Sequence, residues 1–119
     1  MPDPTYIVQL PRCPGFNNLY ANVPGKGRVK TKRYKAWIEE AGKMMLIAGP
    51  RPRLEGPVRL LIEGAIRTDL DAIKAIPDLL QSMGVLVNDA QIAHLEVIRR
   101  GEGELVSVSL WRMGDAGEN

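Results

Sequence analysis

Three aspartates and one lysine stand close together in the chain and could handle a metal ion and a phosphate. Asp69 and Asp71 follow an apolar run, Lys74 comes three residues later, and Asp89 follows a further amphipathic segment. Carboxylates that pack together repel one another unless a cation offsets their charge. Mg²⁺ prefers such oxygen ligands, and a lysine one helical turn away suits a phosphate group. These residues therefore indicate metal-dependent cleavage of a phosphodiester.

The spacing of the acids suggests how they would share one ion. In an extended segment, alternation places Asp69 and Asp71 on the same face, and the intervening helix brings Asp89 back beside them. Water and a phosphate oxygen would complete an octahedral Mg²⁺ shell, with Mn²⁺ as a substitute. The ion would activate a water, and Lys74 would stabilise charge on the phosphate. All four residues are predicted to be catalytic, and the three aspartates are the predicted metal ligands.

The same residues also have an ordinary structural explanation. Asp71 can cap a helix, and Asn88-Asp89 is a common turn dipeptide. Spacing alone leaves both interpretations open. His94 is the only histidine and Cys13 the only cysteine, so the sequence favours no zinc site, no Ser-His-Asp triad and no intramolecular disulfide. We expect a structural or surface role for His94.

Basic residues gather ahead of the acids. The formal net charge is only +2 at pH 7, but a large share of the sixteen lysines and arginines falls in residues 26–35. A locally positive segment can neutralise phosphates while a separate acidic pocket holds metal. The alternative is a solvated loop and helix face. The basic residues of this segment are Lys26, Arg28, Lys30, Lys32, Arg33 and Lys35.

Composition indicates one globular domain with a core, because the chain has 119 residues and is 45% hydrophobic. Aromatic residues make up 5%, which argues against a base-stacking platform of the single-strand-binding type. We expect the domain to cover residues 1–113 and a disordered tail to follow at 114–119. No signal peptide or membrane-spanning run is recognisable, so we expect a soluble, cytoplasmic protein with no membrane partner.

The pattern of apolar residues predicts the elements that position the site. Helices are expected from the N-cap Thr31 to Ala48 and from about Asp71 to Gly84, where Pro77 requires a later start or a kink. The order β-α-β-α-β-β predicts an α+β domain with a mixed sheet and its helices on one face. The last two strands are expected to form a hairpin whose edge is a candidate dimer surface. The predicted strands are 6–10, 58–66, 91–99 and 104–112, with a long loop at 11–30.

Several short motifs follow one another in a fixed order along most of the chain. They are Asn18-Leu19-Tyr20, Gly27-Arg28 before a basic helix, Asp69-Leu70-Asp71, Lys74, Asp78-Leu79-Leu80, a glycine near position 84, and Asn88-Asp89-Ala90-Gln91-Ile92. In this order and spacing the chain resembles the RusA family of Holliday junction resolvases. Members of that family are small dimeric endonucleases associated with phages and prophages.

The resemblance implies a Mg²⁺-dependent homodimer that resolves four-way DNA junctions by paired symmetric nicks, in recombination and repair. Asp69, Asp71 and Asp89 match the family's metal-binding acids, and Lys74 matches its essential lysine. Asp78 and Asn88 are expected to support those ligands without binding the metal. The residues expected to contact DNA are Asn18, Tyr20, Lys26, Arg28, Lys30, Lys32, Arg33, Lys35 and Arg67.

The chain also departs from the family's pattern. The family usually has an asparagine directly after the second acid and its lysine four residues on, whereas here Ala72 follows and Lys74 is three residues on. Thr68 stands where the family has a basic residue, with Arg67 displaced by one, and Pro77 falls in the helix. These departures motivate an alternative, a catalytically weak or inactive relative that binds branched DNA. A third interpretation is a small interaction protein whose acids only cap and solubilise.

Overall fold

Four strands form one mixed sheet in the order β1 (Tyr6–Pro11), β6 (Leu105–Arg112), β4 (Val58–Gly64) and β5 (Ile92–Arg99). β6 is antiparallel to both of its neighbours, while β4 and β5 are parallel. The computed structural model describes residues 3–14, 19–66, 69–100 and 103–113, and within helix α2 it describes only the backbone of residues 69–72. The predicted α+β class with a mixed sheet and two main helices is confirmed.

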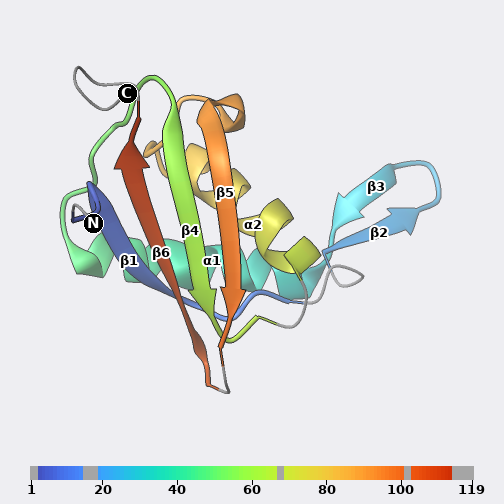
Figure 1. The fold of residues 1–119 in the computed structure, drawn as a ribbon. Coiled ribbons are helices and arrows are strands. Elements are labelled where there is room, and N and C mark those ends of the chain that lie inside the picture. Colours follow the sequence, from blue (N-terminus) through green and yellow to red (C-terminus); the bar gives the residue numbers. More distant parts are fainter. Residues whose placement is uncertain (1–2, 15–18, 67–68, 101–102, 114–119) are drawn as a thin grey trace.

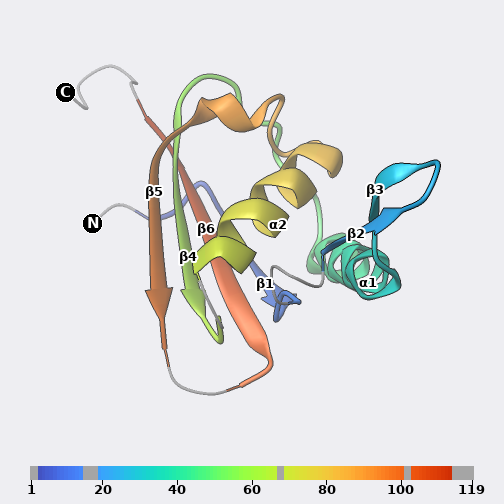
Figure 2. The same ribbon diagram turned by 90° about the vertical axis from the view of Figure 1, so that its right-hand side faces the viewer.

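Both helices cover the same face of this sheet, as Figures 1 and 2 show for α1 (Lys32–Ala48) and α2 (Asp69–Ser82). Alternate strand positions face them because successive side chains of a strand point to opposite sides. The core therefore combines one face of each helix with one face of the sheet. Fully buried residues of the central strands are Val58, Leu60, Ile62, Val106, Val108 and Leu110.

Helix α1 begins and ends where its sequence predicts. Thr31 is the N-cap, and its hydroxyl accepts a hydrogen bond of 3.2 Å from the Tyr34 backbone N–H. Gly49 ends the helix with a φ of 116°, a conformation that L side chains rarely adopt. The buried side of the helix contains Tyr34 and Trp37, which continue the helical spacing expected of a core face.

Helix α2 begins earlier than predicted, at Asp69, and runs through Pro77 to Ser82. The start lies within two residues of the expected Asp71, and the alternative of a later start at Pro77 is wrong. Pro77 has no N–H to offer the carbonyl of Ile73, so the helix gives up one backbone hydrogen bond. Pro77 is itself buried, between core residues Ile76 and Leu79 along the chain. The packing of this apolar face offsets the lost bond.

A second, two-stranded sheet occupies part of the segment predicted to be a long loop. β2 (Tyr20–Val23) pairs with β3 (Gly27–Lys30) in an antiparallel hairpin that extends away from the main sheet (Figures 1 and 2). The turn is closed by a hydrogen bond of 3.0 Å from the Lys26 N–H to the Val23 carbonyl. Gly25 and Gly27 both have positive φ, which explains the two glycines at this tip.

The last two strands do not form the predicted hairpin with each other. β4 lies between β5 and β6, so β5 and β1 are the edges of the main sheet and β6 is central. The pattern of alternate apolar residues predicts which side chains face the core, but it does not predict which strands become neighbours. β4 is connected to β5 through α2, and a helical crossover of this kind joins parallel neighbours. β6 then pairs with the other side of β4.

Several smaller expectations can be compared with the structure. His94 is exposed on β5, in agreement with a surface position, and Cys13 is buried and not disulfide-bonded. In the part of the chain that the structure describes, no helix is both long and apolar enough to cross a membrane. The expected tail at 114–119 lies outside the described residues.

Candidate functional site

The start of helix α2 carries the two acids on which the predicted metal site depends. Asp69 is its first residue and Asp71 belongs to its first turn. The expectation of an extended segment is wrong, because positions two apart in an α-helix lie about 200° apart around the axis. The side chains of Asp69 and Asp71 lie outside the described residues, as do the residues Asn18 and Arg67 that were expected to contact DNA. Metal binding by these acids stays a prediction.

Asp89 lies near the opposite end of α2. Its backbone N–H donates a hydrogen bond of 3.1 Å to Gln81 Oε1. Gln81 follows Asp71 by ten positions, which corresponds to about 15 Å along a helix. Figures 1 and 2 likewise show the short 3₁₀ helix η2 (Asp89–Gln91) beyond the far end of α2. Within a single chain, Asp89 is therefore too far from the first turn of α2 to share a metal ion with Asp71.

The Asn88-Asp89-Ala90-Gln91 motif has a structural role of its own. Asn88 is the N-cap of η2, and its Oδ1 accepts a hydrogen bond of 2.7 Å from the Ala90 N–H. Gln91 Oε1 accepts from the Asn88 N–H, at 3.0 Å. Gln91 Nε2 donates to the carbonyls of Leu54 and Gly56, at 2.9 and 2.8 Å. Asn88 and Gln91 thus fasten the entry of β5 to the segment before β4, and only the exposed Asp89 carboxylate is left for chemistry.

The acids and histidine of the described residues do not gather as metal ligands would. No group of three or more histidine, cysteine, aspartate or glutamate side chains close enough to hold an ion occurs among the side chains that the structure describes. Asp69 and Asp71, whose side chains the structure does not describe, stay the predicted ligands. Their carboxylates are hard oxygen donors of the kind that Mg²⁺ prefers.

The predicted basic segment places its side chains in solvent on two elements, the β2–β3 hairpin and the start of α1. The β2–β3 hairpin carries Lys26 in its turn and Arg28 and Lys30 on β3. Arg28 and Lys30 lie on the same side of that strand, because they are two positions apart. Lys32, Arg33 and Lys35 lie in the first turns of α1. All six side chains are exposed. We call this set the basic hairpin surface.

The charged residues at the start of α1 are of the sign that destabilises a helix. Its first turn contains no acidic residue, although the N-terminal end of a helix carries a partial positive charge that favours acids. Lys32 and Arg33 therefore add positive charge to a positive end. Each such residue destabilises a helix by about 0.3–1 kcal/mol. A surface arranged in this way favours anions.

Tyr20 joins the basic hairpin surface to helix α2. The Arg28 guanidinium lies 4.3 Å from the centre of the Tyr20 ring, and Lys74 Nζ lies 5.8 Å from the same point. Lys74 also forms an ion pair of 3.5 Å with Asp78 one turn later on α2. Both members of this pair are partly exposed, so the pair adds little to stability. Lys74 and Asp78, expected from the sequence to act together with the acids, thus face the basic hairpin.

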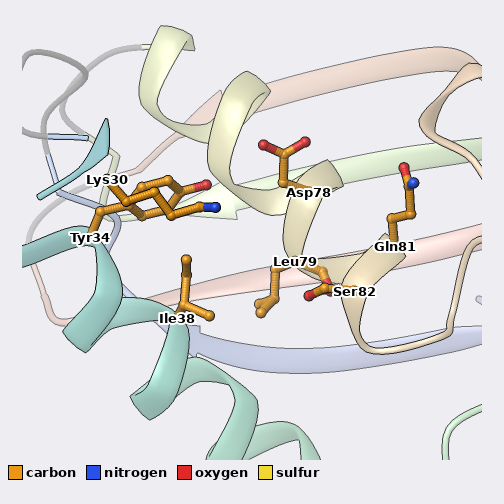
Figure 3. A pocket seen from close by; sticks show the side chains of 7 residues that line it. All are labelled: Lys30, Tyr34, Ile38, Asp78, Leu79, Gln81 and Ser82. Atoms are coloured by element: carbon orange, nitrogen blue, oxygen red, sulfur yellow. The ribbon is translucent and has the colours of Figure 1, made fainter. Parts of the chain in front are cut away.

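A pocket opens between α1, β3 and α2, beside this contact (Figure 3). Its volume is about 330 Å³. Lys30 and Tyr34 line one side, and Asp78 and Gln81 come from α2 on the other. The Tyr34 hydroxyl and the Lys30 amine lie side by side and point into the space between the two helices (Figure 3).

Tyr34 is the residue of this region that sequence reasoning did not identify. Its helical spacing with Trp37 correctly predicts a core position, and the ring is fully buried. Its hydroxyl, however, is a buried polar atom at the edge of the core, and helical periodicity does not reveal where such an atom points. Burial raises the pKa of the Tyr34 phenol, and the carboxylate of Asp78 raises it further. The phenol therefore stays protonated across the physiological range.

Comparison with known proteins adds no assignment. The chain matches no protein-family model and no curated protein.

Proposed function

We propose that this chain is a Mg²⁺-dependent endonuclease that binds four-way DNA junctions as a homodimer and nicks two symmetry-related strands. The observation that carries the proposal is the contact between the basic hairpin surface and α2, in which Tyr20 lies beside both Arg28 and Lys74. It supports a single site in which backbone-binding cations adjoin the acids of α2. The order of the RusA-like motifs along the chain supports the same reading.

Each part of the proposed site has a distinct role. The basic hairpin surface binds phosphates on the strand that enters the site, so recognition is mainly of backbone shape. Asp69 and Asp71 would hold the ion, which when bound polarises the phosphate and supplies an activated water. Lys74 lies three and five residues beyond these acids on the same helix and offers a positive charge to the phosphate. Asp78 holds the ammonium group of Lys74 by its ion pair.

The dimer is proposed for reasons of symmetry. A four-way junction presents two equivalent strands, and a two-fold dimer presents two equivalent sites. The main sheet has two edges, and β5 is paired only with β4. An exposed edge strand offers unpaired backbone groups to a second chain. We therefore keep β5, rather than a β5–β6 hairpin, as the candidate dimer surface.

A second candidate function is favoured by the position of Asp89. An ion held at the first turn of α2 lacks this third carboxylate within one copy, because Asp89 lies beside Gln81. The acids of the first turn are also stabilising without a ligand, since they oppose the positive end of the helix. This arrangement suits a protein that binds branched DNA and cleaves it weakly or not at all.

One experiment separates these candidates. Purified protein is mixed with a synthetic four-way junction and with linear duplexes of the same arms, first in Ca²⁺ to measure binding and then in Mg²⁺ to measure nicking. Preferred binding of the junction with paired nicks supports the nuclease. Preferred binding without nicks supports the binding protein. Equal affinity for junction and duplex, or none for either, would refute both.

A further inference from the structure

A hollow of about 290 Å³ lies between the segment that follows β1 and the first half of α1. Arg12 and Pro14 line it from that segment, and Arg33 and Glu40 line it from α1. Arg12 and Arg33 are exposed, so both guanidinium groups are open to a ligand from solvent. Two arginines from distant parts of the sequence therefore share one concave surface.

The charges of these two arginines are not offset by a neighbouring carboxylate. Neither forms an ion pair or a side-chain hydrogen bond with any residue that the structure describes, and Glu40 forms no ion pair with either. Two like charges in one hollow repel each other. A guanidinium also keeps its proton at every physiological pH, so this repulsion is not relieved by deprotonation. The hollow therefore favours an anion that both arginines can bind.

The backbone that carries Arg12 is held in place on both sides. Trp37 Nε1 donates a hydrogen bond of 2.9 Å to the carbonyl of Pro11, and the Arg12 N–H donates one of 2.9 Å to the carbonyl of Glu104. Arg33 lies in the first turn of α1, behind the N-cap Thr31. Both arginines thus extend from a fixed backbone, which lowers the entropic cost of holding one ligand between them.

A phosphate group is the anion that matches this pair. The planar guanidinium offers parallel N–H donors with the spacing of phosphate oxygens, so one arginine can bind a phosphate through two hydrogen bonds. Arg33 also belongs to the basic hairpin surface. A DNA strand that follows this surface therefore reaches the hollow, and its phosphate is bound together with its neighbours, which a free phosphate ion is not.

We propose that Arg12 and Arg33 together bind one phosphate of the DNA, so that the DNA-binding surface extends from the basic hairpin surface across the start of α1 to the end of β1. The inference rests on the proposed function, since the junction supplies the strand. Arg12 is the residue that this inference adds to the surface. Glu40 lowers the positive charge of the hollow and limits how tightly the phosphate is held.

The first test measures junction binding in Ca²⁺, so that nicking does not interfere. Arg12→Gln is expected to weaken binding about tenfold, the factor for one hydrogen bond to a charged group, and to lower the salt dependence by about one phosphate contact. Arg53→Gln is the matched control, because Arg53 is also exposed and has no ion pair with a described residue but lies in the hollow beside Asn88 and Gln91. It should change the affinity far less. Thermal unfolding should be the same for the wild type and both variants.

A scan of the DNA tests whether the two arginines hold the same phosphate. Each phosphate near the branch point is replaced in turn by an uncharged methylphosphonate. We expect one position at which the replacement weakens binding of the wild type much more than binding of Arg12→Gln or Arg33→Gln.

A change of the opposite sign tests the hollow itself. Glu40→Gln removes the carboxylate beside the two arginines and should strengthen binding of the unmodified junction. Glu39→Gln is its control, because Glu39 makes the same charge change but pairs with Lys43 at 3.5 Å and does not line the hollow. It should strengthen binding less.

The outcomes distinguish this inference from the proposed function. Equal junction affinities of Arg12→Gln and Arg53→Gln would overturn the inference and leave the proposed function standing. So would a scan in which both arginine variants respond at every position as the wild type does. The expected scan with no nicking in Mg²⁺ would keep the inference and refute the nuclease. A wild type that binds no junction would overturn both.

Discussion

At the scale of single residues, the site depends on groups whose surroundings differ from those of ordinary surface residues. Burial raises the pKa of the Tyr34 phenol, and the nearby Asp78 carboxylate and a hydrogen bond with Tyr20 raise it further. Lys74 divides its contacts between the Asp78 carboxylate and the Tyr20 ring. The sequence predicts Lys74 from its place beside the acids, and it predicts Asp78 from the resemblance to the RusA motifs. It does not predict Tyr34, because an aromatic residue on an apolar helix face is ordinarily core.

The raised pKa of Tyr34 predicts a loss of stability at alkaline pH. An unfolded tyrosine ionises near pH 10, whereas the folded protein keeps this phenol protonated. The unfolded state therefore releases its proton first, and the free energy of unfolding should fall as the pH rises above about 10. Urea denaturation of Tyr34→Phe at pH 8 and pH 10.5 should show a smaller fall than the wild type. An equal fall in the two proteins would contradict the assignment.

Lys74 should matter for cleavage and little for folding. Its ion pair with Asp78 is partly exposed, and exposed pairs contribute about 0–1 kcal/mol. Lys74→Ala should therefore unfold close to the wild type but nick junctions about a hundredfold more slowly, a usual effect of losing one charge that stabilises a transition state. Lys43→Ala is the control, because Lys43 forms an equivalent 3.5 Å pair with Glu39 on α1. Equal nicking by both variants would show that Lys74 has no catalytic role.

At the scale of elements, the candidate site lies where the β2–β3 hairpin, the first turns of α1 and helix α2 come together. The sequence predicts α1 closely, because Thr31 caps it, Gly49 ends it and its apolar residues recur at helical spacing. It does not predict the β2–β3 hairpin, whose strands are short and largely exposed, with little apolar alternation. It predicts the start of α2 to within two residues, but it does not decide how the helix accommodates Pro77, which depends on the packing of Ile76 and Leu79.

Lys32, at the start of α1, should strengthen DNA binding but lower the stability of the folded protein. Lys32→Glu places an acid at the positive end of the helix and should raise the free energy of unfolding by about 0.3–1 kcal/mol. The same substitution should weaken junction binding and lower its dependence on salt, since one phosphate contact is lost. Lys43→Glu, farther along the same helix, makes the same charge change outside the basic hairpin surface and should leave junction binding almost unchanged. Equal losses of affinity in the two variants would indicate a general effect of net charge.

In the motif at η2, Asn88 should be important for stability, whereas Asp89 should not. Asn88→Ala removes the side-chain cap of η2 and should lower the free energy of unfolding by about 1 kcal/mol. Asp89→Ala should change stability little, because the carboxylate is exposed and the hydrogen bond to Gln81 comes from the backbone. Chemical denaturation measures both. A larger loss in Asp89→Ala than in Asn88→Ala would reverse this division of roles.

At the scale of the whole molecule, the topology decides which predicted residues meet. The β4–α2–β5 crossover brings Lys74 of α2 near Tyr20 of the hairpin and leaves Asp89 at the entry of β5, beyond the far end of the helix. Order and type of most elements follow from local patterns of apolar residues. Strand neighbours and the distance between Asp71 and Asp89 do not, because they depend on how the elements pack. The contact of Tyr20 with both Arg28 and Lys74 nevertheless joins the hairpin to α2, and the proposed nuclease depends on that contact.

The most direct test of the central claim is the nicking of a four-way junction in Mg²⁺ by the wild type and by Asp71→Asn, mapped strand by strand. The substitution keeps the size of the side chain and removes the charge that would hold the ion. We expect the wild type to nick two opposing strands symmetrically, and Asp71→Asn to bind the junction with similar affinity but to lose nicking at least a hundredfold, on the order expected when a metal ligand is lost. Equal nicking by the two proteins, or none by the wild type despite tight junction binding, would contradict the proposed metal-dependent nuclease.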